Sequence, residues 1–287
     1  MAARARAAGT TGSGDLARTL AWLEKSGSQT VRDGMARYGI PSERAFGISV
    51  GALKAYAREL GKSQTLALGL WSAGFYEARM LAAFVAEPAA FDVAQMNAWA
   101  KDFDSWAICD TVCFHAFDRT PLAWGRLTPW AAAKAEFHKR GAFALLWGLT
   151  VHDKQASDDR FLECLPLIEA AATDERDYVK KGVDMALRAM GKRNAALRAA
   201  ALELATRLSE AEAGPGAWIG RSALRDLAKT RTAKSRTSKT PSARSSPAQK
   251  RTTKKPSTQT PAAEKPSAKK PAPQKPAPQK FAAKKRR

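Results

Sequence analysis

The chain of 287 residues contains 48 Lys and Arg against 27 Asp and Glu, which gives a formal net charge of +21 at pH 7. Residues 229–287 hold 19 of the basic side chains but one acid, Glu264, so a net charge of +18 lies in this segment. A segment with this much charge of one sign and one large apolar side chain, Phe281, cannot bury a core. The composition therefore excludes a globular domain in this segment and indicates a polyanionic partner.

The C-terminal segment, residues 229–287, has the composition of a disordered polycation. Nine of the 15 prolines lie in it, and Pro-Ala-Pro-Gln-Lys occurs twice in succession at residues 271–280. No helix or strand persists at that proline spacing. We expect this tail to bind nucleic acid without sequence preference, through contacts between its basic side chains and phosphates. A linker needs no charge of one sign, and a membrane anchor would need an apolar face or an acylation signal.

The N-terminus and the cysteines restrict the compartment. Residues 1–14 contain no apolar run, which predicts a disordered segment without a secretory signal or a membrane span. Three cysteines, an odd number, argue against a disulfide framework. We therefore expect a soluble intracellular protein with reduced thiols. Cys109, Cys113 and His115 lack a fourth metal ligand at suitable spacing, so we expect no metal and no other cofactor.

Residues 15–228 have the apolar periodicity of helices, with residues recurring at three- and four-residue spacing and few alternating runs. Ser, Thr or Asp precedes many of the expected helices, as helix N-caps do. The expected helices cover residues 15–26, 28–38, 49–61, 63–72, 76–86, 92–102, 105–118, 121–150 with a break, 158–172, 175–190, 194–209 and 216–228.

The expected helices are arranged in pairs. Short turns separate them, and a pair returns roughly every 35 to 45 residues, which is the size of a HEAT-like unit. The sequence thus predicts an all-α protein with one domain, residues 15–228, built as a HEAT-like helical-repeat superhelix (an α-solenoid). A compact helical bundle is the alternative, because the repeats are too degenerate to align by eye.

One expected helix carries a carboxylate on an apolar stripe. Trp106 and Asp110 are four residues apart and share a face, which Cys113 extends. In one interpretation Asp110 pairs with an Arg and joins two helices. In the other, Asp110 and the indole of Trp106 face a cleft and are suited to a cationic centre, because one supplies negative charge and the other a π face.

Basic side chains form two further clusters. Arg140 lies among apolar neighbours in a helix and is either the structural partner of Asp110 or a fork that binds a phosphate. The second cluster occupies two consecutive helices and is either a solvated face or a phosphate-contacting one. It comprises Lys180, Lys181, Arg188, Lys192, Arg193 and Arg198.

Several common catalytic motifs are absent from the sequence. It contains no Gly-rich phosphate loop, no HExxH and no Gly-x-Ser-x-Gly elbow, which excludes most nucleotide hydrolases, zinc peptidases and α/β hydrolases. His152 follows the end of an expected helix, where a cation is favoured, so we interpret it as a capping residue.

The order of these clusters resembles the bacterial DNA alkylation repair glycosylases with HEAT-like repeats, the AlkD family. The similarity covers most of residues 15–228 and is most specific at Trp106-Ala-Ile-Cys-Asp110, which resembles the family's Trp-x-x-x-Asp in the active cleft. Arg140 falls where the family has its third active-site residue, an Arg. The other matching stretches are Met35-Ala36-Arg37-Tyr38, Phe46-Gly47-Ile48, Leu70-Trp71, Glu77-Ala78-Arg79 and Lys180 to Arg188.

The resemblance implies that the protein excises N3- or N7-alkylated purines from duplex DNA. Breakage of the N-glycosidic bond gives the sugar oxocarbenium character, which a carboxylate can stabilise while it orients water. By this resemblance Asp110 is the catalytic carboxylate, Trp106 packs on the sugar and backbone of the lesion, and Arg140 holds the adjoining phosphate. Family members work on the lesion without drawing it into a pocket, unlike most enzymes that excise bases.

The chain departs from the family pattern at Met185, which stands where a second Trp of the cleft is expected. A Met fills volume and contacts a sugar through its thioether, but it has no π face for a cation. This departure concerns catalytic efficiency more than DNA binding. The residues expected to contact DNA are Tyr38, Lys180, Lys181, Met185, Arg188, Lys192 and Arg193.

Three functions are compatible with these features. The leading hypothesis is a monofunctional DNA glycosylase for alkylated purines, held on DNA by its tail. The alternatives are a non-catalytic DNA-binding protein that senses damaged or distorted DNA, favoured by Met185, and a scaffold that binds peptides on its concave face. For the first we expect a monomer in the bacterial cytoplasm, associated with the nucleoid, whose partners are alkylated double-stranded DNA at the cleft and any DNA at the tail.

Overall fold

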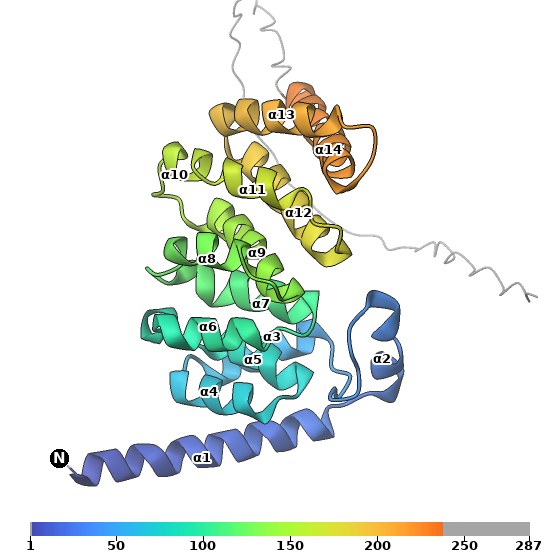
Figure 1. Cartoon of the computed structure of the whole chain (residues 1–287). Helices are drawn as coiled ribbons and strands as arrows, with labels where there is room; N and C mark the ends of the chain where they lie inside the picture. Colours follow the sequence, from blue (N-terminus) through green and yellow to red (C-terminus); the bar gives the residue numbers. More distant parts are fainter. Residues whose placement is uncertain (1, 238–287) are drawn as a thin grey trace, which may run out of the picture. The chain divides into compact units, whose positions relative to one another are not determined.

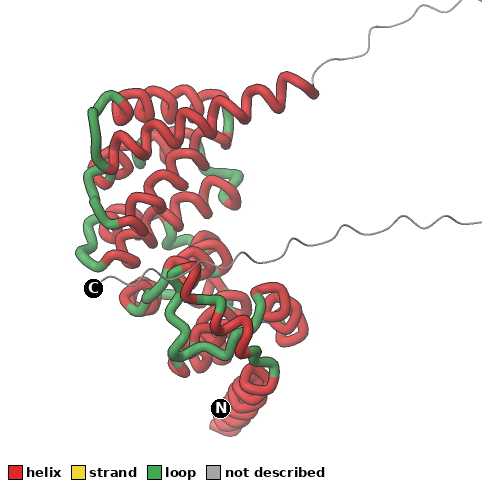
Figure 2. Tube along the Cα trace, turned by 90° about the vertical axis from the view of Figure 1, so that its right-hand side faces the viewer, coloured by secondary structure: helices red, strands yellow, loops and turns green. Residues whose placement is uncertain are grey.

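The computed structural model describes residues 2–237, with side chains for residues 14–229. Within this range all regular secondary structure is helical, in fourteen α-helices and four short 3-10 helices, and the connections are loops (Figures 1 and 2). The all-α prediction is confirmed for the described residues. None of their helices combines the length and the apolar character needed to cross a membrane.

The observed helices follow the expected ones closely. In chain order they are α1 (Ala2–Lys25), α2 (Gln29–Asp33), η1 (Ala36–Tyr38), α3 (Val50–Leu60), α4 (Gln64–Ala73), α5 (Tyr76–Val85), η2 (Pro88–Ala90), α6 (Val93–Lys101), α7 (Trp106–His115), η3 (Phe117–Arg119), η4 (Trp124–Arg126), α8 (Leu127–Ala131), α9 (Glu136–His152), α10 (Asp158–Leu162), α11 (Leu165–Ala171), α12 (Asp177–Arg193), α13 (Ala195–Ser209) and α14 (Pro215–Thr237).

Side-chain caps fix the starts of many helices. At six helices the residue before the first turn accepts a hydrogen bond from the backbone N–H three positions later, which satisfies a donor that the helix leaves free. These caps are Ser28, Ser49, Ser63, Asp92, Ser105 and Asn194. Ser105 matters most for the site, because it places Trp106 in the first turn of α7.

The helices form two rows. In one row α3, α5, α7, α9, α12 and α14 pack each on the next, while α4, α6, α8, α11 and α13 pack against this row from the other side. The helices follow one another in sequence order from blue to orange (Figure 1). This is a helical-repeat architecture of the predicted HEAT-like type rather than a compact bundle. A continuous buried core lies between the rows and includes Trp130, Phe117, Phe143 and Phe161.

The structure differs from the sequence prediction at both ends of the helical region. Helix α1 begins at Ala2, so residues 2–14 are helical, and α14 continues to Thr237, nine residues beyond the predicted boundary. Both extensions lack proline; the first begins with a run of Ala and Arg, and the second contains Lys, Arg and Ala, all of which are good helix formers. The rest of the predicted tail, residues 238–287, lies outside the described residues.

A buried carboxylate attaches the segment before α3 to the helical rows. Glu77 in α5 is fully buried, and its two oxygens accept hydrogen bonds from the backbone N–H groups of Phe46, Gly47 and Ile48 at 2.8, 2.7 and 3.1 Å. Three donors compensate the cost of burying the charge. Residues 35–48, here called the N-terminal strap, are thereby held beside the row of helices that carries the site.

Candidate active site

Asp110 and Arg140 form a two-point ion pair between α7 and α9. The Nε and Nη2 groups of Arg140 donate to the two carboxylate oxygens of Asp110 at 2.8 and 2.7 Å. The Nη1 group donates to the backbone carbonyl of Tyr178 in α12 at 2.7 Å. The side chain of Arg140 is 4% exposed and that of Asp110 is 15% exposed, so the pair lies largely out of water. One guanidinium thus joins three consecutive helices of the row.

Burial and pairing act in opposite directions on this carboxylate. Burial raises the pKa of Asp110, and the charge and hydrogen bonds of Arg140 offset part of that rise. Burial alone would lower the pKa of Arg140, but the adjacent carboxylate outweighs it and raises that pKa. The guanidinium therefore stays protonated, and its charge and hydrogen bonds favour the ionised form of Asp110. This is the structural pairing that the sequence left as one of two interpretations.

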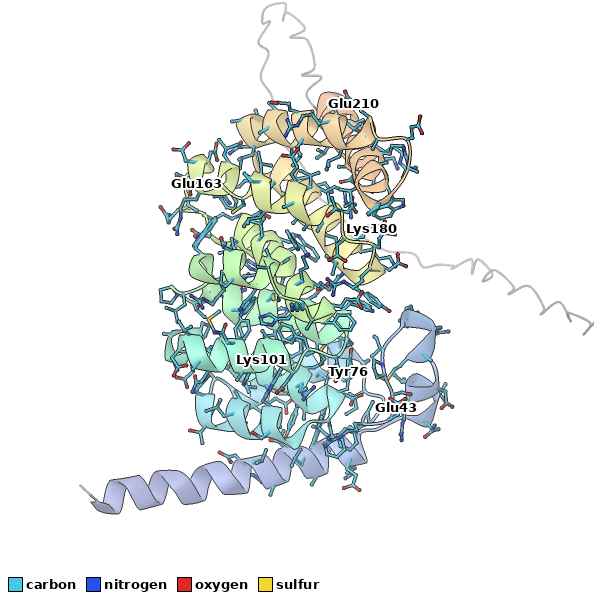
Figure 3. The ribbon with its side chains drawn as sticks, viewed as in Figure 1. Glu43, Tyr76, Lys101, Glu163, Lys180 and Glu210 are labelled. Carbon is cyan, nitrogen blue, oxygen red and sulfur yellow. The ribbon has the colours of Figure 1, made fainter. Side chains whose placement is uncertain are left out.

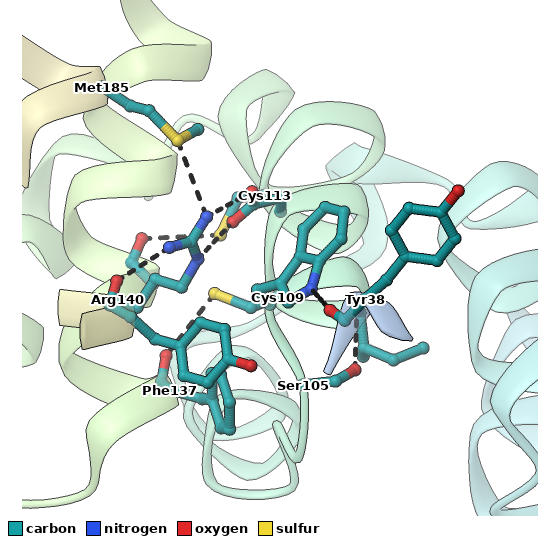
Figure 4. Close-up of polar contacts among 12 residues, drawn as sticks. Tyr38, Ser105, Cys109, Cys113, Phe137, Arg140 and Met185 are labelled. Carbon is teal, nitrogen blue, oxygen red and sulfur yellow. Dashed lines mark hydrogen bonds and ion pairs between the residues drawn. The ribbon is translucent and has the colours of Figure 1, made fainter. Parts of the chain in front are cut away.

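Trp106 is held at the start of α7 by a distant segment. Its indole N–H donates to the backbone carbonyl of Tyr38 at 2.8 Å, and Tyr38 belongs to the N-terminal strap (Figure 4). The hydroxyl of Tyr178 donates to the carbonyl of Gly39 in the same strap at 3.5 Å. The strap therefore contacts the starts of both α7 and α12.

These groups surround a pocket of about 510 Å³. The strap, α7, α9, α12 and α14 all contribute to its wall. The lining residues are Arg37, Tyr38, Gly39, Trp106, Arg140, Tyr178, Lys181, Asp184, Met185, Arg188 and Trp218. Asp110 is not among them, so its carboxylate lies beside Arg140 at the edge of the pocket. The pocket has aromatic and basic walls, a combination suited to a nucleotide.

Met185 occupies the predicted position on α12 and lines the pocket. Its sulfur accepts a hydrogen bond from Nη2 of Arg140 at 3.7 Å and points toward that guanidinium (Figure 4). Trp218 in α14 lines the same pocket and is 38% exposed, and Nζ of Lys180 lies 5.4 Å from the centroid of its ring. The pocket therefore has a second indole besides that of Trp106, supplied by a different helix from the one the resemblance implied.

The predicted DNA-contacting residues divide into two groups. Tyr38, Lys181, Met185 and Arg188 line the pocket, and Tyr38 is 58% exposed. Lys180 lies at the start of α12, paired with Asp177 (Figure 3), and Lys192 pairs with Asp226. Apart from Tyr38, which belongs to the N-terminal strap, all of these predicted DNA-contacting residues lie on α12.

The structure gives Arg193 a structural role instead. Its guanidinium donates to the carbonyls of Thr150, Asp153 and Ala156 at 2.9, 2.8 and 3.1 Å, and lies over the ring of Phe161. Arg193 thus caps the end of α9, and its donors are directed into the protein. These donors are therefore not directed toward a DNA phosphate.

The cysteines of α7 are packing residues. Cys109 and Cys113 are buried, and their thiols donate to the carbonyls of Phe137 and Gly141 at 3.5 Å each. Burial raises the pKa of Cys113 well above its ordinary value, so the thiol is retained. No group of three or more His, Cys, Asp or Glu within the described range is placed to hold a metal ion. His152, expected to be a capping residue, ends α9 and hydrogen-bonds to Asp118.

Sequence reasoning assigned no role to five residues of the pocket lining, namely Arg37, Gly39, Tyr178, Asp184 and Trp218. Tyr178 and Asp184 belong to α12, where periodicity indicates only a helix, and Trp218 lies more than 100 residues after Trp106. No local spacing links Trp218 to the other residues. The sequence offers one signal: Trp218 lies in the first turn of an expected helix, where neighbouring residues cover a large apolar side chain less completely.

A family model and a solved structure match the chain. The family model described as "DNA alkylation repair enzyme" matches residues 19–234. The chain belongs to this family. Among the curated proteins, none matches the chain.

One solved structure shares the fold of this DNA alkylation repair family member. It is described as "a new family of proteins related to the HEAT-like repeat DNA glycosylases with affinity for branched DNA structures". The two are 19% identical with a TM-score of 0.64, over 75% of this chain and 95% of that one. At this identity the likeness shows the HEAT-like-repeat fold alone, and the affinity for branched DNA is a property of that protein.

Proposed function

We propose that this DNA alkylation repair family member is a glycosylase that removes N3- or N7-alkylated purines from duplex DNA. One observation carries the proposal: the carboxylate of Asp110, paired with Arg140, is fixed about one helical turn from Trp106, beside a pocket whose lining includes Trp106, Met185 and Trp218. These groups come from three helices, α7, α12 and α14, and the fold brings them together. A pocket with basic and aromatic walls is suited to DNA.

The proposed chemistry needs little from the protein, because an alkylated purine is cationic and already a good leaving group. As the N-glycosidic bond breaks, the sugar gains positive charge and water attacks it. Arg140 uses one lone pair of each Asp110 oxygen, and further lone pairs remain on both. Asp110 would use these to orient the water and to stabilise the sugar.

Arg140 acts as a positioning residue in this proposal. With its side chain 4% exposed and its three nitrogens bonded to Asp110 and Tyr178, it has little freedom to bind a phosphate. It holds the carboxylate in a single orientation instead. Lys181 and Arg188, which line the pocket, are better placed for the phosphates beside the lesion, and the C-terminal tail would add affinity for any DNA.

The test is the release of N3-methyladenine and N7-methylguanine from methylated duplex DNA by the full chain and by Asp110→Asn. A matched control is Asp174→Asn, because Asp174 also binds an Arg through two contacts, with Arg176 at 2.8 and 2.6 Å, but lines no part of the pocket. We expect Asp110→Asn to slow release by about 100-fold or more and Asp174→Asn to change it by less than about threefold.

Each outcome is decisive for one part of the proposal. Equal release by the full chain and Asp110→Asn would remove the role given to Asp110. Equal losses in Asp110→Asn and Asp174→Asn would mean that a broken ion pair, rather than a missing catalytic group, explains the effect. If the full chain bound methylated DNA and released no base, the glycosylase proposal would be wrong.

A second candidate function is DNA binding without base excision. The observation that favours it is the neutral charge of the Asp110–Arg140 pair, which weakens the field of the carboxylate at a developing cation, together with the absence of Asp110 from the pocket lining. The related protein with affinity for branched DNA gives this candidate a DNA structure to test. Binding to branched DNA without release of methylated bases would support it.

A further inference from the structure

A second pocket of about 360 Å³, here called the basic pocket, lies at the other end of α7. Its lining is mostly apolar, from Ala57 and the ring of Phe84, with basic groups at the rim. The residues that form it are Lys54, Ala57, Arg58, Gly61, Lys62, Phe84 and His115, from α3, α5, α7 and the turn after α3. The volume is near the lower end of the range for ligand pockets, which suits one planar ring rather than a large molecule.

Three cations lie at the rim of the basic pocket. Lys54, Arg58 and Lys62 are exposed and form no salt bridge with a carboxylate of the described chain. Lys62 donates to two carbonyls at the end of α5, and Nζ of Lys54 lies 5.5 Å from the centroid of the Phe84 ring. Nε of Arg58 donates to the carbonyl of Lys54 at 3.2 Å, which leaves its Nη groups for a ligand.

The pKa of His115 responds to the positive charge of the basic side chains around this pocket. Its ring packs edge-on against Phe84 at 4.9 Å between centroids. Burial, and then the charges of Lys54, Arg119, His152 and Lys62, lower the pKa of His115 to about 4. The imidazole is therefore neutral at physiological pH, and an anion bound beside it would raise its pKa.

We propose that the basic pocket binds an unpaired nucleotide of a DNA strand, with its base against Phe84 and its phosphate between Lys54 and Arg58. An apolar floor with an aromatic ring is suited to the face of a base, which is accessible only when the base is unstacked. Cations outside any salt bridge are suited to the phosphate of the same nucleotide. Paired duplex offers the phosphates but not the base face, so the pocket selects for single-stranded or branched positions.

The basic pocket and the candidate active site lie at opposite ends of α7. The partly exposed residues of α7 are Trp106, Asp110, Thr111, Phe114 and His115, while the rest of the helix is buried. They cover about half of the helix circumference, because Trp106 and His115 are nine residues, or about two and a half turns, apart. The helix rises by about 14 Å from Trp106 to His115, which is the rise of about four base pairs of duplex. The inference requires DNA as the partner but does not require base excision.

Binding of unmodified DNA tests the proposal independently of glycosylase activity. The affinities of the full chain are compared for a perfect duplex and for the same duplex with a single-stranded flap, in the native protein, Lys54→Gln and Phe84→Leu. We expect Phe84→Leu to weaken binding of flapped DNA by about tenfold more than binding of the duplex, because only the flap offers a base face. Lys54→Gln removes a phosphate contact and should weaken binding of both DNAs. Lys101→Gln in α6 is the matched control, because it removes one exposed charge elsewhere (Figure 3).

The pKa of His115, followed by NMR, gives a second readout that tolerates a folding defect in Phe84→Leu. Flapped DNA should raise this pKa from about 4 in the native protein, and less so in Lys54→Gln. Equal losses of affinity for flap and duplex in Phe84→Leu, or losses in Lys101→Gln as large as those in Lys54→Gln, would overturn the proposal. So would an unchanged pKa of His115 at saturating flapped DNA.

Discussion

The hydroxyl of Tyr178 contacts the carbonyl of Gly39, although 139 positions separate these residues in the chain. Together with the bond from Trp106 to Tyr38, this contact attaches the N-terminal strap to the pocket wall. Gly39 has a φ of 65°, which an L side chain adopts only with strain, and a Cβ there would overlap the Tyr178 hydroxyl.

We therefore predict that Gly39→Ala lowers the free energy of unfolding more than Gly→Ala at a position where the positive φ is the only source of strain. Gly214 has a φ of 97° and no atom within 4 Å of an added Cβ, so Gly214→Ala is the matched control. Strain costs about 1–2 kcal/mol at either site, and the overlap at Gly39 adds to it. Urea unfolding of both variants measures the difference. Adding Tyr178→Phe should recover the excess cost at Gly39, and equal costs at the two glycines would contradict the prediction.

The second prediction concerns the charge state of Asp110. Arg140→Met removes the cation that opposes the effect of burial, so the pKa of Asp110 should rise further. In the proposed mechanism the active form of Asp110 is the ionised carboxylate, which is populated above that pKa. The pH at which base release reaches half of its maximum should therefore be higher in Arg140→Met than in the native protein, and release by the variant should recover as pH rises. The unpaired carboxylate should also cost about 3 kcal/mol of stability.

Release rates at saturating methylated DNA over a range of pH, with folding checked at each pH, measure this effect. Arg176→Met, which breaks the Asp174 pair outside the pocket, is the control and should leave the pH profile of release unchanged. A parallel drop of Arg140→Met at every pH would show that Arg140 has a role other than holding the charge of Asp110.

The sequence predicts those features that depend on neighbouring residues. The helices, their Ser and Asp caps and the shared face of Trp106 and Asp110 follow from local spacing, and the structure confirms the helices and caps. Contacts between distant segments leave no such pattern. In the sequence, the Glu77 carboxylate that binds the strap is one acid in a helix, and Arg193 is one more member of a basic cluster.

The third prediction concerns Trp218, which supplies the second indole of the pocket. In the family pattern this second indole comes from the position that Met185 occupies here. Trp218→Leu keeps an apolar side chain but removes the π face, and should lower kcat/KM for methylated duplex by about fivefold. Met185→Trp should raise the rate in the native chain and restore it in Trp218→Leu. Trp22→Leu is the control, because Trp22 stacks on Tyr56 and lines no part of this pocket. An equal loss in the control would contradict the role of Trp218.

The last prediction separates the tail from the helical domain at the boundary that the structure gives. Residues 238–287 contain 15 Lys and Arg and one acid, and truncation after Thr237 keeps α14 with Trp218 intact. The slope of log affinity against log salt should become shallower by about 0.9 for each DNA phosphate contact that the truncation removes. The truncated chain should therefore bind undamaged duplex more weakly and with a flatter salt slope, while release from saturating methylated DNA is unchanged. A full-length variant with these 15 residues changed to Gln should behave like the truncated chain if charge is responsible. If it retains the native salt slope, the tail acts through something other than its charge.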